Sequence, residues 1–274
     1  MAKISLFLAI FLVSLKADSP DPRELVRRSV TAEMENSKRA KNYTFVQRTE
    51  DRELDDRGHV KSSESKTYDI TILQGSSYRR LIAEDDQPLS PKEEKKEEEK
   101  LRKSSDERRR ESRSTHDKRV TEYDNRPGRD RQMLSEIPEA FDFRLRGEEV
   151  IESRPTYVVV GTPHPGYQAK SAAARLILPK LKVTVWIDKA DLNWVRIHAD
   201  VIDFVSWAFC LFRLAPGAQF DVQQTLVNNE VWLPRTAKIM GSARIALIKK
   251  VNMEQDLTFK NFRKFQTDSE MVSR

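Results

Sequence analysis

The chain has a single cysteine, Cys210, among its 274 residues, so no disulfide can form within it. The neighbours of Cys210 are apolar, which predicts an inert buried thiol, because reactive cysteines need an electropositive and partly exposed setting. No cysteine follows the apolar run at the amino terminus, and this excludes a lipid-attachment site there. We therefore expect neither cross-links nor thiol chemistry.

Long hydrophobic runs are scarce as well. The clear example, residues 4–15, follows Lys3 and is shorter than the roughly 20 apolar residues that a membrane-spanning helix needs. A short apolar run behind a positive start is typical of a secretory signal peptide. We predict a signal peptide over residues 1–17, a lipid-binding domain over 18–274 and export to the periplasm. Leu15 is large for its place before the cleavage site, so an uncleaved membrane anchor is the alternative.

Patterns that carry catalysis or bind metals are also missing. The four histidines are dispersed without ligand spacing: His59, His116, His164 and His198. The sequence has no glycine-rich phosphate loop and no nucleophile elbow. Asp188 and Asp191 flank an expected hairpin turn, where aspartate is favoured for its bonds to the backbone, so a turn outweighs an acid–base pair. We predict a protein that is not an enzyme and that uses no cofactor and no metal; a hydrolase is the third alternative.

Charge is abundant but nearly balanced, with 49 Lys and Arg against 43 Asp and Glu. The interspersed signs predict a solvated surface and no nucleic-acid partner. Charge is densest in residues 90–119, where Leu101 is nearly the only apolar side chain. Opposite charges four residues apart support a solvated helix. We expect an exposed, partly helical insertion, and a mobile arm or partner-binding helix is the functional alternative.

The rest of the chain predicts two helices and many strands. The helices are expected over residues 23–34 and 132–141. The strands are expected over residues 43–49, 66–73, 78–83, 141–146, 156–161, 181–188, 193–202, 204–214, 220–227, 231–233, 236–249 and 252–265. Meander connectivity is the simplest topology, and strands of this length suit a large curved antiparallel sheet.

Residues 204–214 are apolar on both alternating faces when interpreted as one strand, which predicts a core on one side and an apolar cavity or a second cover on the other. The expected cavity wall is the odd-numbered face, with Val205, Trp207, Phe209 and Leu211, and the even-numbered face is the alternative. Trp186, Trp194 and Trp232 are further candidate ligand contacts, although each tryptophan taken singly is more typical of a core. Asp203 is a carboxylate in this apolar setting and needs a partner or a raised pKa.

Three short motifs resemble a known family. They are Tyr43-x-Phe45-x-Gln47, Val185-Trp186-Ile187-Asp188 and Val231-Trp232-Leu233-Pro234. With the amino-terminal helix, they resemble the outer-membrane lipoprotein-sorting proteins of bacteria, the relatives of LolA, LolB and the lipid-binding half of RseB. The resemblance runs from about residue 25 to 265. It implies a mainly β (α+β) fold, in which a curved antiparallel sheet forms an unclosed β-barrel with an amino-terminal helix and short covering helices, around a cavity that accepts acyl chains.

The charged insertion and the overall length depart from the family pattern, which leaves the cargo open. The prediction is a periplasmic carrier whose partner is a lipid or the acyl chain of a lipoprotein, with transient membrane contact and a membrane protein as a further partner. Burial of each methylene of such a ligand contributes about 0.8 kcal/mol. The alternative is a signalling or interaction module of the cell envelope that senses lipoproteins on the same fold.

Overall fold

The computed structural model describes residues 19–124, 126–207, 212–245 and 249–265. Its helices are α1 (Pro22–Ala40), α2 (Pro91–Arg110), α3 (Arg113–Asp124), α4 (Arg126–Ala140), α5 (Ala172–Ile177) and the 3₁₀ turn η1 (Leu178–Lys180). Its strands are β1 (Tyr43–Leu54), β2 (Val60–Leu73), β3 (Ser76–Glu84), β4 (Gln87–Pro88), β5 (Phe141–Ile151), β6 (Arg154–Pro163), β7 (Leu181–Asp188), β8 (Trp194–Val201), β9 (Val205–Trp207), β10 (Phe212–Leu214), β11 (Gln219–Val227), β12 (Val231–Ile245) and β13 (Lys249–Lys264).

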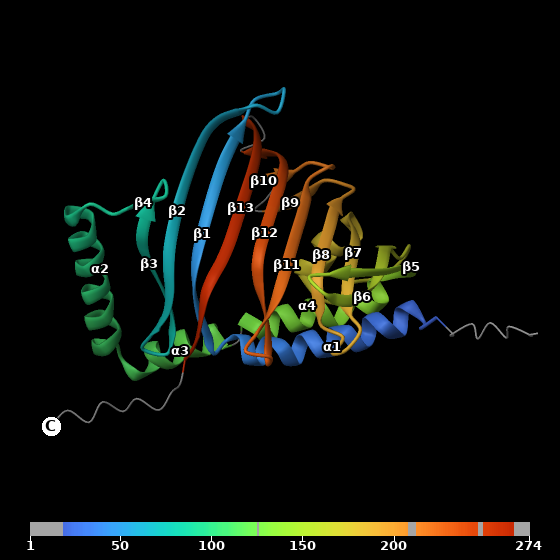
Figure 1. The fold of residues 1–274 in the computed structure, drawn as a ribbon, viewed down its shortest axis with the longest axis horizontal. Helices are drawn as coiled ribbons and strands as arrows, with labels where there is room; N and C mark the ends of the chain where they lie inside the picture. The colour runs from blue at the N-terminus through green and yellow to red at the C-terminus, as the bar shows by residue number, and fades with distance from the viewer. Residues whose placement is uncertain (1–18, 125, 208–211, 246–248, 266–274) are drawn as a thin grey trace, which may run out of the picture.

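The strands form one curved antiparallel sheet of 13 strands (Figure 1). Its order is β4-β3-β2-β1-β13-β12-β11-β8-β7-β6-β5, and β9 and β10 form a side branch on β12. Most neighbours are consecutive in the chain, as expected of a meander, but pairing of β1 with β13 joins the two halves of the molecule. The end strands β4 and β5 do not pair with each other within the described residues, so the sheet is unclosed and the predicted fold class is confirmed.

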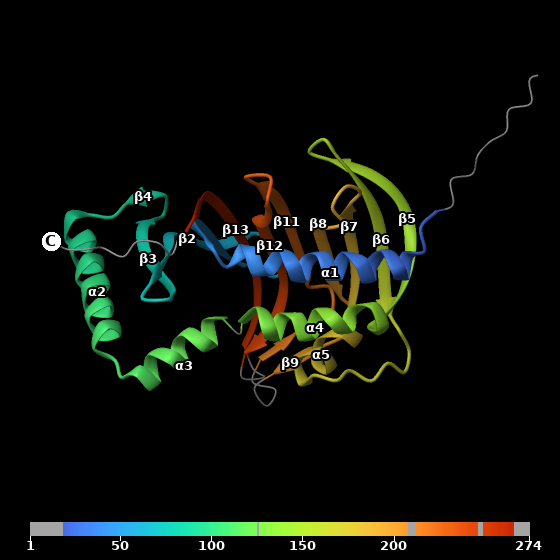
Figure 2. The same cartoon turned by 90° about the horizontal axis from the view of Figure 1, so that it is seen from below.

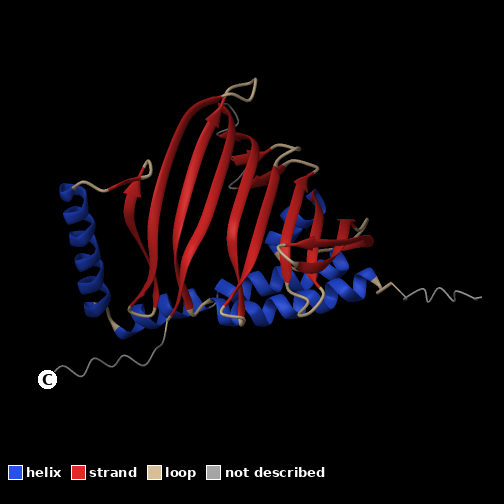
Figure 3. Cartoon of the chain, viewed as in Figure 1, coloured by secondary structure: helices blue, strands red, loops and turns tan. Residues whose placement is uncertain are grey.

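Helix α1 begins where the sequence provides a cap. The side chain of Asp21 accepts hydrogen bonds from the backbone N–H groups of Arg23 and Glu24, and Pro22 occupies the first turn. Leu25, Val26 and Val30 are buried against the sheet. Figure 2 shows α1 and α4 lying side by side along one face of the sheet, called the inner face below. This helix pair covers β5 to β8, β11 and β12 and leaves the opposite, outer face uncovered (Figure 3).

The charged insertion is more regular than expected, since α2 runs through 20 residues and α3 follows it. Ser90 and Glu93 form a capping box that starts α2. The insertion is held by arginines rather than by an apolar stripe. Arg108 donates hydrogen bonds to backbone carbonyls of the β2–β3 turn and its flanking strands, at Leu73, Ser76 and Ser77, and Arg119 donates to the carbonyl of Gln74 and to the Ser76 hydroxyl.

The expected single strand over residues 204–214 is wrong. The structure divides it into β9 and β10, which pair antiparallel with each other, with Trp207 opposite Phe212 and Val205 opposite Leu214. A hairpin gives the apolar side chains partners across the pair, whereas one strand would have needed separate covers on its two faces. β-Branched and aromatic residues favour a strand in both arrangements, so propensity could not separate them.

None of the helices in the described part of the chain is long and apolar enough to cross a bilayer.

Candidate ligand-binding cavity

An apolar cavity of about 500 Å³ lies on the inner face at one end of the sheet. Its lining consists of apolar residues alone: Leu176, Ile177, Leu181, Ala199, Val201, Val205, Leu214 and Phe220. This volume lies within the roughly 300–1,000 Å³ that is usual for small-molecule sites. An ordered water molecule needs polar partners, and this lining offers none. The cavity therefore suits a hydrocarbon ligand.

Strand alternation explains the lining. Leu181 on β7 lies opposite Val201 on β8, and Ala199 on β8 lies opposite Phe220 on β11, so these side chains share the inner face. The intervening Asp200 lies opposite Lys182 and Gln219 on the outer face. The sequence pattern of β7, β8 and β11 therefore produces an apolar floor.

The cavity has two walls above this floor. One is α5 with η1, where Ser171 caps the helix by accepting a hydrogen bond from the N–H of Ala174 and where Leu176 and Ile177 pack beside Val205. The other is the β9–β10 hairpin, which contributes Val205 and Leu214.

A bend in the chain sets the position of the hairpin. The segment between β10 and β11 bonds back to Val201, and Gly217 adopts a left-handed φ of 87° there. Ala218 then approaches β12 so closely that a Cβ at Gly241 would lie 2.5 Å from the Cβ of Ala218. Glycine at residue 241 therefore allows Ala218 to approach β12 this closely.

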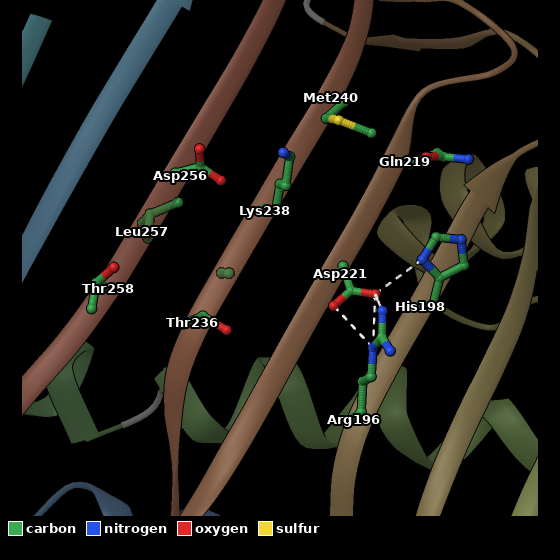
Figure 4. A pocket seen from close by; sticks show the side chains of 11 residues that line it. Arg196, His198, Gln219, Asp221, Thr236, Lys238, Met240, Asp256, Leu257 and Thr258 are labelled. Carbon is green, nitrogen blue, oxygen red and sulfur yellow. Dashed lines mark hydrogen bonds and ion pairs between the residues drawn. The ribbon is translucent and has the colours of Figure 1, made fainter. Parts of the chain in front are cut away.

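The outer face carries a second pocket, of about 490 Å³, with polar walls. Figure 4 shows Arg196, His198 and Asp221 pointing toward one another across β8 and β11. Asp221 Oδ2 lies 2.7 Å from Arg196 Nη2 and 3.1 Å from His198 Nδ1. Asp200 Oδ1 lies 3.3 Å from the other ring nitrogen of His198. These groups satisfy one another as a cross-strand charge ladder, which is a stabilising arrangement on an exposed sheet face.

The three tryptophans with described side chains lie away from the apolar cavity, since the cavity lining includes none of them. Trp186 lies on the outer face, where its indole N–H donates to Glu149 at 2.8 Å and Arg196 stacks 4.9 Å from its ring centroid. Trp194 and Trp232 are buried near α1. Their role in ligand binding stays a prediction.

Of the other candidate residues, Trp207 belongs to β9 by its backbone, and its side chain is not described. Phe209 and Leu211 lie outside the described residues, as does Cys210. Asp203 is exposed and accepts a hydrogen bond from the backbone N–H of Phe204, so it is not the buried carboxylate that the apolar run suggested.

A polar seam joins α1 to the sheet. The Trp194 indole N–H donates to Ser29 Oγ at 2.9 Å, and the Asn36 side chain exchanges two hydrogen bonds of 2.8 Å with the backbone of Trp232. Between them, Glu33 accepts a hydrogen bond from Gln224 at 2.6 Å, while its other carboxylate oxygen is buried without a partner. Burial raises the pKa of Glu33 to about 7, and the Gln224 hydrogen bond opposes that rise.

The β7–β8 turn completes the seam. Burial alone would raise the pKa of Asp188, but Arg154 at 2.6 Å and the backbone N–H groups of Ala190 and Asp191 hold it below its usual range. Asp191 in turn accepts a hydrogen bond from the Trp232 indole. Asp188 therefore stabilises the β7–β8 turn, as the sequence predicted. Asp191 bonds Trp232, the residue whose backbone is bonded to α1.

Sequence reasoning missed Leu176 and Ile177 because no element was expected between residues 162 and 180. A serine before a run of alanines, Ser171-Ala172-Ala173-Ala174, is a helix start that could have been found. Ser29, Glu33 and Asn36 also carried a signal, because polar residues spaced by four and three follow one stripe of an otherwise amphipathic helix.

Within the described residues, no group of three His, Cys, Asp or Glu side chains is placed to hold a metal ion. The scan against models of protein families and the search of curated protein sequences give no match.

The search of solved structures gives several similar chains. A putative outer membrane lipoprotein-sorting protein domain from Vibrio parahaemolyticus has 11% identity and a TM-score of 0.36, with 90% of this chain and 95% of that one covered. A LolA superfamily protein from Nitrosomonas europaea has 9% identity and a TM-score of 0.33, with 93% and 99% covered. MucB in the MucA/MucB complex of Pseudomonas aeruginosa has 10% identity and a TM-score of 0.25, with 89% and 99% covered.

Proposed function

We propose that this protein is a carrier that binds the acyl chain of a lipid or lipoprotein in the inner cavity. The observation that supports the proposal is the lining, which is apolar at every position around about 500 Å³. Burying an acyl chain there removes its methylenes from water at about 0.8 kcal/mol each, with no polar group of the lining left unpaired.

Trp207, Phe209 and Leu211 stay predicted ligand contacts in this proposal, because Val205 and Leu214, which precede and follow them in the chain, line the cavity. Trp186, Trp194 and Trp232 stabilise the framework in this proposal, since their indole groups have partners elsewhere. The carrier needs no cofactor and no catalytic group. It is exported to the periplasm, and amino-terminal sequencing of the exported protein checks residue 18 as its first residue; an intact Met1 on membrane-bound protein would contradict export with cleavage.

The test fills the cavity without adding polarity. Ala199 is buried on the cavity floor, so Ala199→Phe places a ring in the space that the acyl chain needs. Ile202, the first residue after β8, is 50% exposed and lies outside the lining, so Ile202→Phe is the matched control. We expect A199F to weaken binding of a fluorescent fatty acid at least about tenfold, since losing two buried methylenes costs about 1.6 kcal/mol.

Mass spectrometry of lipid extracted from the purified protein provides the second measurement. Bound lipid in the parent protein and in I202F, but not in A199F, supports the carrier. A parent protein that neither retains extracted lipid nor takes up the fluorescent fatty acid would contradict it. Equal uptake by A199F and I202F would place the ligand elsewhere.

The exposed helix α2 supports a second candidate, a module that passes the ligand state to a partner protein. Its side chains are exposed or half-buried except for Glu97, and it projects beyond β3 at the edge of the sheet (Figure 1). A partner that binds the parent protein but not a variant lacking residues 90–119, in a lipid-dependent way, would favour this candidate.

A further inference from the structure

A third pocket lies on the far side of the β9–β10 hairpin from the apolar cavity. It has a volume of about 270 Å³ and is lined by Phe204, Arg213, Ala215, Ser242, Ala243 and Lys250. The two spaces share a wall. Val205 and Leu214 line the cavity, while Phe204 and Arg213, each one residue earlier in the chain, line the third pocket.

Two cationic residues line this pocket, Arg213 on β10 and Lys250 on β13. Like charges that line one pocket repel, and a bound anion would offset that repulsion.

Arg213 is the group that lacks a counter-charge. Its guanidinium lies 3.7 Å from the ring centroid of Phe204, and its Nε is buried without a hydrogen-bond partner. No carboxylate among the described residues forms an ion pair with it. Lys250 is different, because it bonds Asp56 at 2.9 Å, and both of those side chains are exposed. The neighbouring Asp203 carboxylate bonds the backbone N–H of Phe204.

We propose that this pocket binds a phosphate monoester group, with Arg213 as its main contact and Lys250 beside it. The guanidinium is the side chain best suited to a phosphate, because two of its planar N–H donors match two oxygens.

The same chemistry comes from two sources, free inorganic phosphate or the phosphate headgroup of a single-chain lipid. The headgroup version rests on the proposed function, since its acyl chain would lie in the cavity on the other side of the shared hairpin. In that case the hairpin separates the two ends of one ligand, and charge selects anionic over neutral lipids.

Isothermal titration of the mature chain with three probes tests this: inorganic phosphate, dodecyl phosphate and the neutral lipid monolaurin. The variants are Arg213→Gln, Arg213→Lys and Lys250→Gln. Arg235→Gln is the matched control, because Arg235 is an exposed arginine that pairs with Glu152 outside this pocket. Thermal unfolding of each variant checks the fold, and R213K keeps the charge if R213Q unfolds.

We expect R213Q to weaken dodecyl phosphate binding about tenfold or more, with smaller losses in R213K and K250Q and none in R235Q. Monolaurin binding should be unchanged. Phosphate binding that R213Q abolishes would identify the free anion as sufficient, and binding of the amphiphile alone would identify the headgroup.

Two results would overturn the anion site: unchanged dodecyl phosphate affinity in a folded R213Q, or equal losses for monolaurin and dodecyl phosphate. If neither amphiphile binds the parent protein, the carrier proposal fails, while Arg213-dependent binding of inorganic phosphate would still support the anion site. If monolaurin binds and no phosphate compound depends on Arg213, the carrier stands and the anion site fails.

Discussion

The two ends of the inner sheet face differ in what covers them. Beneath α1, the sheet residues Val185 and Ile187 are 6% and 0% exposed and pack against Leu25, Val26 and Val30. Beneath α5, similar apolar strand residues line a cavity instead. The helices account for the difference, since α1 has 19 residues and α5 has six. The same alternating strand pattern thus gives a packed core under a long helix and a hollow under a short one.

The largest expected effect sharpens this contrast. Ile187→Ala removes a fully buried side chain from the packed end and should lower the free energy of unfolding by about 2–5 kcal/mol. Leu214→Ala, at the cavity, should cost clearly less, because Leu214 borders space that is already empty and its truncation creates little new void. Urea unfolding of the two variants measures both losses. Equal losses would show that the cavity is filled by protein in solution.

A second prediction concerns the seam at the packed end. The folded pKa of Glu33 is raised to about 7 from 4.5, so folding favours the protonated carboxyl. The stability from this group is complete below pH 4.5 and is lost as the pH rises through 7. The loss amounts to about 3 kcal/mol for a shift of this size. Urea unfolding between pH 4 and 8 measures it.

Glu33→Gln is the control for this pH dependence, because glutamine keeps a hydrogen-bonding group without a titration. The variant should lack the pH-dependent contribution of Glu33 to the free energy of unfolding. It should therefore be more stable than the parent protein at pH 8. Asp188 has the opposite pH dependence. Its lowered pKa stabilises the folded protein above the usual pKa of an aspartate, and this stabilisation is lost as the pH falls through the pKa of the folded state. A parent protein and an E33Q variant with the same pH profile would show that Glu33 is solvated.

The contrast between the two ends also explains what the sequence could predict. Apolar and polar residues alternate along residues 181–185, and this pattern identified β7 with its observed bounds. The β9–β10 hairpin could not be predicted, since residues 208–211 contain no glycine, asparagine, aspartate or proline to mark a turn.

The sequence predicted the type of candidate site but not all of the residues that form it. An apolar cavity beside residues 204–214 was expected, and Val205 and Leu214 line one. The partners of Trp194 and Trp232 could not be predicted, because Ser29 and Asn36 lie 165 and 196 residues away in the chain and only the packing of α1 brings them to the sheet.

The smallest expected effect concerns the charged insertion, whose helix α2 buries no apolar side chain. Arg108 holds α2 to carbonyls at the β2–β3 turn, so Arg108→Gln should release the helix while the free energy of unfolding changes by about 1 kcal/mol or less. Hydrogen exchange along residues 91–110 should rise, and that along β7 and β8 should stay constant. Arg109→Gln is the matched control, since Arg109 is exposed and its partners among the described residues are Ser105 and Asp106 on its own helix. A large loss of stability in R108Q alone would mean that the insertion is part of the cooperative fold, and the comparison between a packed end and a hollow end would then need α2 as a third structural element.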